Sequence, residues 1–141
     1  MELELAYLAG LVDGEGCIMI NRFATTRSHI GYQYRVILEI TMCERQTIEF
    51  IAATFDRPIE TRTLKSGKTA YKVIWRNQPA ANILELLLPY LKGKREQAVV
   101  CLEFQKMTPG RGRDYKNTDF DILEQLRLKV KWLKTAEALR C

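Results

Sequence analysis

The chain has 141 residues, of which 47% are hydrophobic and 28% are charged, and its formal net charge is +5. These values are typical of one globular domain and exclude extensive disorder. The longest nearly apolar run, residues 83–91, contains Glu85 and is too short to cross a bilayer.

The apolar periodicity alternates along the chain between that of helices and that of strands. Two of the strands flank residues 65–68, whose sequence is typical of a hairpin turn. In chain order we expect a helix over residues 3–13, strands over 17–23 and 32–42, a helix over 44–55, strands over 59–64 and 69–76, and helices over 79–88, 95–107 and 122–139. This order predicts an α+β fold, in which an αββαββα core with a curved four-stranded antiparallel sheet is followed by C-terminal helices.

We expect residues 1–107 to form the core, and residues 108–141 to form a basic connector and a last helix that packs on the same domain. Spacing directs Leu123, Leu126, Val130 and Leu133 of that helix inward. Trp75 and Trp132 are also expected in the core.

Charge is unevenly distributed along the chain. Residues 1–16 contain acids and no base, whereas bases predominate in residues 17–76 and 92–116. A basic body of this kind suits a polyanionic partner such as nucleic acid, although many basic proteins are merely soluble.

The first predicted helix carries a row of small residues, Ala6, Gly10 and Gly14, at every fourth position. A row without large side chains allows a second backbone to approach closely. The row indicates either close packing inside one chain or a helix pair between two copies.

Residues 8–16, with the sequence LAGLVDGEG, resemble the signature of the LAGLIDADG homing endonucleases. Residues 89–98, PYLKGKREQA, resemble that family's second landmark, and the predicted element order fits as well. The resemblance covers about residues 3–107 and implies a metal-dependent, site-specific DNA endonuclease. Since the chain has one motif, it also implies a homodimer with Ala6, Gly10 and Gly14 in the interface.

The resemblance assigns the metal ligand to Glu15, helped by the backbone carbonyl of Gly14. A hard ion such as Mg²⁺, or Mn²⁺, stabilises charge on a phosphate and activates water. The alternative for Glu15 is a solvated acid, although an acid is unfavourable at the carboxyl end of a helix. Lys94 matches the family's active-site lysine; Arg95 could serve instead, or Lys94 could merely face solvent.

Met42 departs from the family pattern, because it stands where the family has a polar active-site residue. Methionine cannot hold water as a polar side chain does. This leaves open whether Glu39, Arg45 or Gln46 substitutes, whether the enzyme is slow, or whether the chain is an intron RNA maturase. A non-cleaving DNA-binding protein of the same fold is a further alternative.

One face of the predicted sheet suits the major groove of double-stranded DNA, where side chains of alternating residues can read bases. A register slip of one residue would exchange the whole face. The residues expected to bind DNA are Cys17, Met19, Asn21, Phe23, Gln33, Arg35, Ile37, Glu39, Glu60, Arg62, Lys65, Lys68, Lys72, Ile74 and Arg76. Of these, Lys65 and Lys68 belong to the hairpin turn and either contact phosphates or are simply solvated. The same two alternatives, contact with phosphates or exposure to solvent, apply to Arg111, Arg113 and Lys116 of the connector.

The resemblance also implies a long pseudo-palindromic target, 3′ overhangs and a gene carried in an intron. The four cysteines are scattered and only one histidine is present, so neither a zinc site nor a disulfide framework is expected. Reduced thiols and the absence of a secretory signal favour an intracellular location, cytoplasmic or in an organellar matrix.

Overall fold

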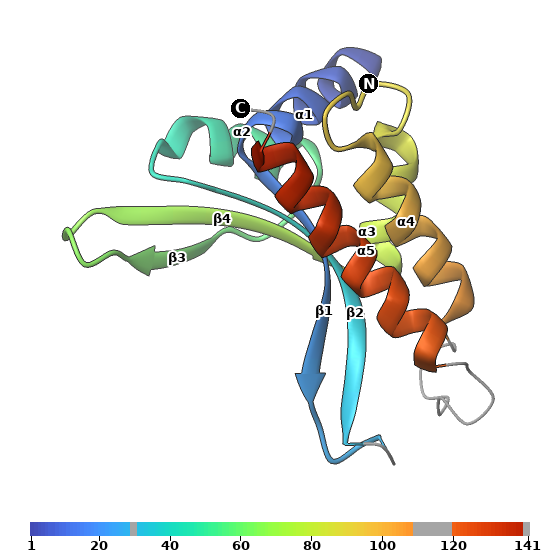
Figure 1. Ribbon diagram of the computed structural model, residues 1–141. Coiled ribbons are helices and arrows are strands. Elements are labelled where there is room, and N and C mark those ends of the chain that lie inside the picture. The colour runs from blue at the N-terminus through green and yellow to red at the C-terminus, as the bar shows by residue number, and fades with distance from the viewer. Residues whose placement is uncertain (29–30, 109–119, 140–141) are drawn as a thin grey trace.

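The computed structural model describes residues 1–28, 31–108 and 120–139 (Figure 1). Its elements are α1 (Glu2–Glu15), β1 (Gly16–Ala24), β2 (Tyr32–Met42), α2 (Arg45–Thr54), β3 (Glu60–Thr63), β4 (Thr69–Arg76), α3 (Asn77–Leu87), α4 (Arg95–Met107) and α5 (Phe120–Leu139). The predicted α+β order is confirmed, with boundaries that differ by a few residues. Arg111, Arg113 and Lys116 lie outside the described residues.

The four strands form one antiparallel sheet in the order β1-β2-β4-β3. The β1–β2 pair and the β3–β4 pair extend in different directions from the centre of the molecule, so the sheet is strongly bent (Figure 1). The helices gather on one side of it. Within the described residues, no helix covers the other side of the bend, which we call the open face (Figure 1).

Alternation along the strands separates the core from the open face. The core side of the sheet is formed by Ile18 and Ile20 of β1, Val36, Leu38 and Ile40 of β2, and Val73 and Trp75 of β4, all of them buried. Trp75 is in the core as predicted. The prediction for Trp132 is wrong, because this side chain is 65% exposed on the outer side of α5.

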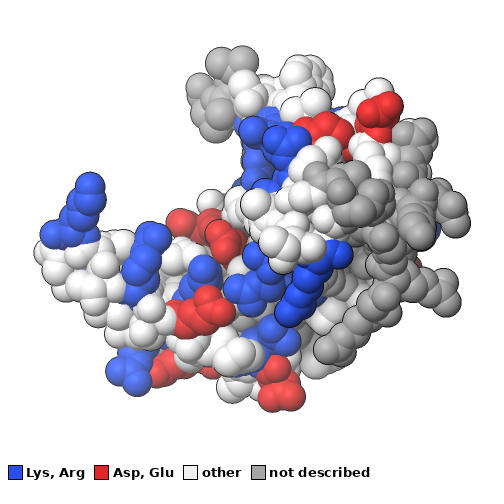
Figure 2. Space-filling view, turned by 90° about the horizontal axis from the view of Figure 1, so that it is seen from below, with Lys and Arg blue, Asp and Glu red and all other residues white. Residues whose placement is uncertain are grey.

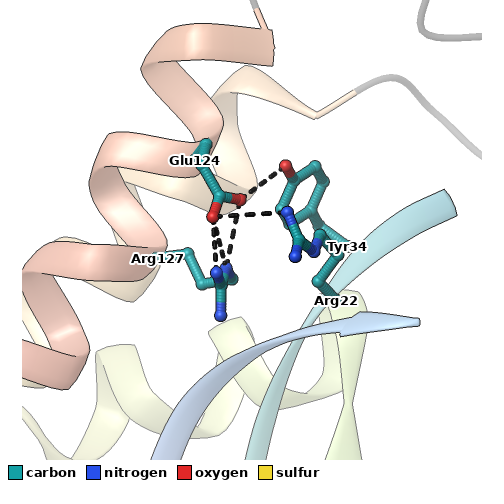
Figure 3. A network of polar contacts seen from close by, with 4 residues as sticks. All are labelled: Arg22, Tyr34, Glu124 and Arg127. Atoms are coloured by element: carbon teal, nitrogen blue, oxygen red, sulfur yellow. Dashed lines mark hydrogen bonds and ion pairs between the residues drawn. The ribbon is translucent and has the colours of Figure 1, made fainter. Parts of the chain in front are cut away.

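Helix α5 is held on the sheet by apolar and polar contacts. Leu123 and Val130 are buried in the core, and Leu126 and Leu133 pack against it, as predicted. The carboxylate of Glu124 joins α5 to the strands (Figure 3). It accepts a 2.7 Å hydrogen bond from the Tyr34 hydroxyl and further hydrogen bonds from the Arg127 guanidinium. It also forms an ion pair with Arg22 at 3.5 Å.

This network predicts how stability depends on pH. Burial and the hydrogen bond to Glu124 raise the pKa of Tyr34 above 10.0, and hydrogen bonds from Arg127 and Tyr34 lower the pKa of Glu124 below 4.5. The stability from Tyr34 is therefore present below pH 10 and lost above it, whereas that from Glu124 is lost as the pH falls below 4.5. We expect Tyr34→Phe to cost about 1 kcal/mol at neutral pH and to flatten the alkaline loss. Urea denaturation at acidic, neutral and alkaline pH measures this, and an alkaline slope equal to that of the wild type would contradict it.

In the described ranges, no helix combines the length and the apolarity needed to span a membrane.

Candidate functional site

The site begins at the junction of α1 and β1, where helix passes into strand without a loop. The backbone N–H of Gly16 donates to the carbonyls of Leu11 and Val12 and so caps α1. A Cβ atom on Gly16 would lie 2.7 Å from the Cα of Val12, so only glycine fits this turn. The turn leaves Glu15, the last residue of α1, exposed at the start of the sheet.

Asp13 links this junction to α4. Its carboxylate accepts backbone hydrogen bonds from Lys92 at 2.8 Å and from Lys94 at 2.9 Å, just before α4 begins at Arg95. The orphan amides ahead of a helix favour an acceptor of this kind. Asp13 is thus occupied by the backbone donors that precede α4, which gives its carboxylate a structural role at the junction.

Lys94 reaches the same junction with its side chain. Its ammonium group donates a 2.7 Å hydrogen bond to the backbone carbonyl oxygen of Asp13. The positive charge therefore lies at the carboxyl end of α1, two positions before Glu15 in the sequence, where the helix dipole favours a cation. Arg95 is exposed, and no contact with the junction is recorded for it. The structure therefore places the ammonium group of Lys94, rather than the side chain of Arg95, against the backbone at the end of α1.

The residues at the junction suit a hard cation. Glu15 offers an exposed carboxylate and Gly14 a carbonyl in the last turn of α1, and oxygen ligands are those that Mg²⁺ and Mn²⁺ prefer. Within the part of the chain that the structure describes, no group of three or more acids, cysteines or histidines gathers to enclose a metal. One copy thus supplies a few ligands, which suits an ion that keeps water and phosphate oxygens as its remaining ligands.

Met42, the residue that departs from the family pattern, is the last residue of β2 and pairs with Tyr71 of β4. Both side chains are partly buried and pack against the core. Met42 thus fills space on the core side, in the opposite phase to the open face, and contributes no hydrogen-bonding group there.

The strand registers place the expected DNA-facing residues of the four strands in one phase of the sheet. Cys17 has this phase, but its Sγ atom already accepts a 3.0 Å hydrogen bond from Lys134 of α5, so it is not free for DNA as expected. Cys17 pairs with Glu39, and Glu39 in turn pairs with Ile74. Met19 pairs with Ile37, which pairs with Arg76, and Lys72 pairs with Glu60. The alternative phase, shifted by one residue, is thereby excluded. Ile37 and Ile74 are only 6% and 4% exposed, so they offer a ligand the least surface on this face.

Acidic and basic side chains already pair on the open face. Lys72 lies 3.8 Å from Glu39 and 3.5 Å from Glu60, and Arg76 lies 3.5 Å from the same Glu60 carboxylate. Lys65 and Lys68 are exposed at the β3–β4 turn. Seen from below, basic side chains are interspersed with acidic ones and extend toward the end of this hairpin (Figure 2).

The outward face of α1 is apolar and exposed, with open space beside its glycines. Leu5, Leu8, Ala9 and Val12 face the core, whereas Ala6, Gly10 and Gly14 are exposed. A Cβ atom added at Gly10 or Gly14 would meet nothing within 4 Å, so packing inside this chain does not require glycine there. A helix that is apolar on both sides is normally buried on both.

Large apolar residues, two of them aromatic, extend this outward face. Leu3 is 84% exposed, and Tyr7 and Phe50 of α2 are each 46% exposed with their rings 5.5 Å apart in an edge-on contact. Sequence reasoning did not include them, although Leu3 and Tyr7 continue the stripe of Gly10 and Gly14 at heptad spacing.

Another residue that sequence reasoning missed is Lys134 of α5. Its ammonium group donates to the Sγ atom of Cys17 at 3.0 Å, across 117 positions of sequence. The sequence pattern of α5 does not predict this contact, because the contact depends on how the helix packs along β1.

Comparison with known proteins gives consistent matches. The LAGLIDADG endonuclease family matches residues 8–107. The DNA endonuclease I-CvuI of Chlorella vulgaris is 32% identical over 111 residues, which cover 77% of this chain and 67% of that protein. Two crystal structures of I-CvuI with DNA match this chain at 28% identity, with TM-scores of 0.72 and 0.73. The match covers 94% of this chain and 82% of the I-CvuI chain. The archaeal intron-encoded homing endonuclease I-Vdi141I, complexed with DNA, shares the fold at 13% identity, with a TM-score of 0.64 over 93% of this chain and 98% of that chain.

Proposed function

Because the chain belongs to the LAGLIDADG endonuclease family, we propose that two copies of it form a dimer that cuts both strands of one long pseudo-palindromic DNA site. The observation that carries the proposal is the exposed Glu15 carboxylate at the α1–β1 junction, where Lys94 donates a hydrogen bond to the carbonyl oxygen of Asp13 and where the first strand of the sheet begins. Because Asp13 is engaged by backbone amides, Glu15 is the exposed acid that one copy offers there, and the symmetry of a dimer supplies the second.

Binding is assigned to the open face of the sheet. A two-stranded ribbon fits the major groove, and arginine, asparagine, glutamine and glutamate are all able to pair with base edges. Lys65 and Lys68 at the hairpin turn suit phosphates, which fix the position of the protein without reading sequence. Lys72 and Arg76 reach bases only by loosening their ion pairs with Glu60.

The chain's own residues prepare the reaction at the junction. Glu15 and the carbonyl of Gly14 would hold a divalent metal, for which we propose Mg²⁺, with Mn²⁺ as a substitute. A bound metal of this kind supplies charge stabilisation for the attacked phosphate and lowers the pKa of water. Lys94, fixed by Asp13, places a positive charge where negative charge develops. Gly16 holds the acid at the edge of the DNA-facing surface.

The products and setting follow from the family. We propose staggered ends with 3′ overhangs, a gene carried in an intron, and an intracellular, reducing compartment. The described cysteines Cys17, Cys43 and Cys101 are all unpaired, which supports the last point.

Met42 favours one rival function, that of an intron RNA maturase or a non-cleaving DNA-binding protein. Its thioether packs against the core, so it offers no polar group for a water network. The rival functions differ from the proposed one in that DNA is not cut.

The experiment is to incubate the protein with a randomised duplex library, with Mg²⁺ and then with EDTA, and to sequence the cut ends. We expect Mg²⁺-dependent breaks in both strands at one nearly palindromic site with a 3′ overhang. A recurrent bound sequence that no divalent metal renders cleavable would instead support the rival function. Binding without any recurrent sequence would contradict both.

A further inference from the structure

We propose that Arg35 selects a guanine in each half of the target, and that the ring of Phe23 is the positioning residue for this selection. The inference rests on the proposed DNA-cleaving function and names one of its specificity determinants. It concerns the outer half of the β1–β2 ribbon, away from the metal-binding junction.

The two side chains form a stack on the open face. The Arg35 Cζ atom lies 4.4 Å from the centre of the Phe23 ring. In the strand register Arg35 pairs with Asn21 and Phe23 pairs with Gln33, so arginine and ring are diagonal neighbours. A guanidinium on an aromatic face is attracted by the ring and loses much of its freedom to rotate.

The guanidinium has donors left for a ligand. Its Nε atom is buried without a hydrogen-bond partner, so the pair of terminal nitrogens is the edge that can reach outward. Of the arginines on β1, β2 and β4, all within the described residues, Arg22 is paired with Glu124 and Arg76 with Glu60, each at 3.5 Å. No carboxylate contact is recorded for Arg35, so its charge need not be detached from an acid before it binds.

A fixed guanidinium edge in the major groove fits guanine. The O6 and N7 atoms of guanine accept two parallel hydrogen bonds from arginine, which is the commonest specific contact to DNA. Adenine offers a donor in place of O6 and would oppose one of the two nitrogens. Lysine lacks the planar fork and does not stack flat on a ring.

The strand geometry predicts where the guanine lies. Asn21, the partner of Arg35, is six residues beyond Glu15 along β1. At about 3.3 Å per residue this is about 20 Å, or about six base pairs at 3.4 Å each. The selected guanine is therefore expected about five to seven base pairs outward from the cut phosphate.

The neighbouring positions of the same strands provide a matched control. Arg22 lies over the ring of Tyr32 at 5.1 Å, but both belong to the opposite phase of the strands, and Arg22 pairs with Glu124 of α5. The same chemistry thus occurs twice on one ribbon, once toward DNA and once toward the protein. Only the first should affect sequence preference.

The test measures the base preference of Arg35→Lys, Phe23→Leu, Phe23→Tyr and Tyr32→Leu by library selection, through binding in EDTA and cleavage in Mg²⁺. For the wild type we expect guanine to be preferred about 5- to 150-fold at one symmetric position, the range that a bidentate contact gives. Arg35→Lys should abolish that preference and leave other positions unchanged. Phe23→Leu should reduce it several-fold at the same position. Phe23→Tyr should retain it, and Tyr32→Leu should leave the whole profile as in the wild type.

Several outcomes overturn the inference. A profile unchanged in Arg35→Lys excludes Arg35 as the reader, and a uniform loss at all positions in Phe23→Leu shows a structural effect instead of positioning. Loss of the preference in Phe23→Tyr as well would exclude the ring as the platform. A wild type that selects no recurrent sequence contradicts the proposed function itself, whereas a recurrent sequence indifferent to these variants contradicts only the assignment of Arg35 and Phe23.

Discussion

Glu15→Gln is expected to lower the rate of DNA cleavage by about three orders of magnitude or more while leaving site binding intact. The amide keeps the size of the side chain but loses the charge that holds a divalent ion, and a bound metal provides several kcal/mol of stabilisation to the transition state. Binding persists because the open face is untouched. Single-turnover cleavage in Mg²⁺ and binding in EDTA measure the two effects separately.

The control for this prediction is Glu85→Gln, which removes the same charge from an exposed position of α3. It should cleave as the wild type does. Glu15 is exposed and no hydrogen bond or ion pair is recorded for it in the described chain, so Glu15→Gln should unfold at the same urea concentration as the wild type. Normal cleavage by Glu15→Gln would end the metal assignment and leave Lys94 without an acid to assist.

The sequence predicted the fold because local signals agree with the tertiary arrangement. Strand alternation and helical spacing along residues 16–107 predicted the order of the elements. The phase of the sheet was open to a slip of one residue, and the structure confirms the expected phase, in which Met19 and Asn21 share a face. The glycines of the motif have different structural roles, which the sequence alone does not distinguish. Gly16 is demanded by contact with Val12 in its own chain, whereas Gly10 has open space beside it.

What the sequence did not predict depends on contacts between distant residues. Asp13 bonds to Lys94 across 81 positions, and the pairing of Glu60 with Lys72 and Arg76 requires the β3–β4 register. Trp132 was misplaced because α5 carries two apolar stripes. Packing on β1 and α4 buries the stripe of Leu123 and Val130 and leaves the one with Leu128 and Trp132 outside. Spacing alone cannot choose between two stripes on the same helix.

The open face also shows why residue type does not determine availability. Ile37 has the correct phase to meet DNA and is nevertheless buried on its own face, between the pairing partners Met19 and Arg76. Arg35 has the same phase and keeps its donors. Direct readout is therefore expected to depend on the polar residues of the outer ribbon more than on apolar contacts to thymine.

Gly10→Leu is expected to dissociate the dimer without harming the fold of the monomer. A Cβ at this position meets nothing in its own chain, and leucine is a better helix former than glycine by roughly 1 kcal/mol. In a symmetric interface the added bulk enters twice, at about 1–3 kcal/mol for each copy. The dimer dissociation constant should therefore rise about 30-fold or more. Sedimentation equilibrium measures the constant, and circular dichroism with urea denaturation checks the fold.

Cleavage should fall with dimerisation, because one copy presents one Glu15 and cannot cut both strands at a symmetric site. Glu85→Leu places a leucine at an exposed position of α3, away from the stripe of small residues, and should remain a dimer. If Gly10→Leu stays dimeric and cuts normally, the small residues of α1 belong to no interface. A Gly10→Leu monomer that stays folded but inactive would show that the active site is completed only by the second copy, and that the exposed stripe from Leu3 to Gly14 exists to bring the two acids together.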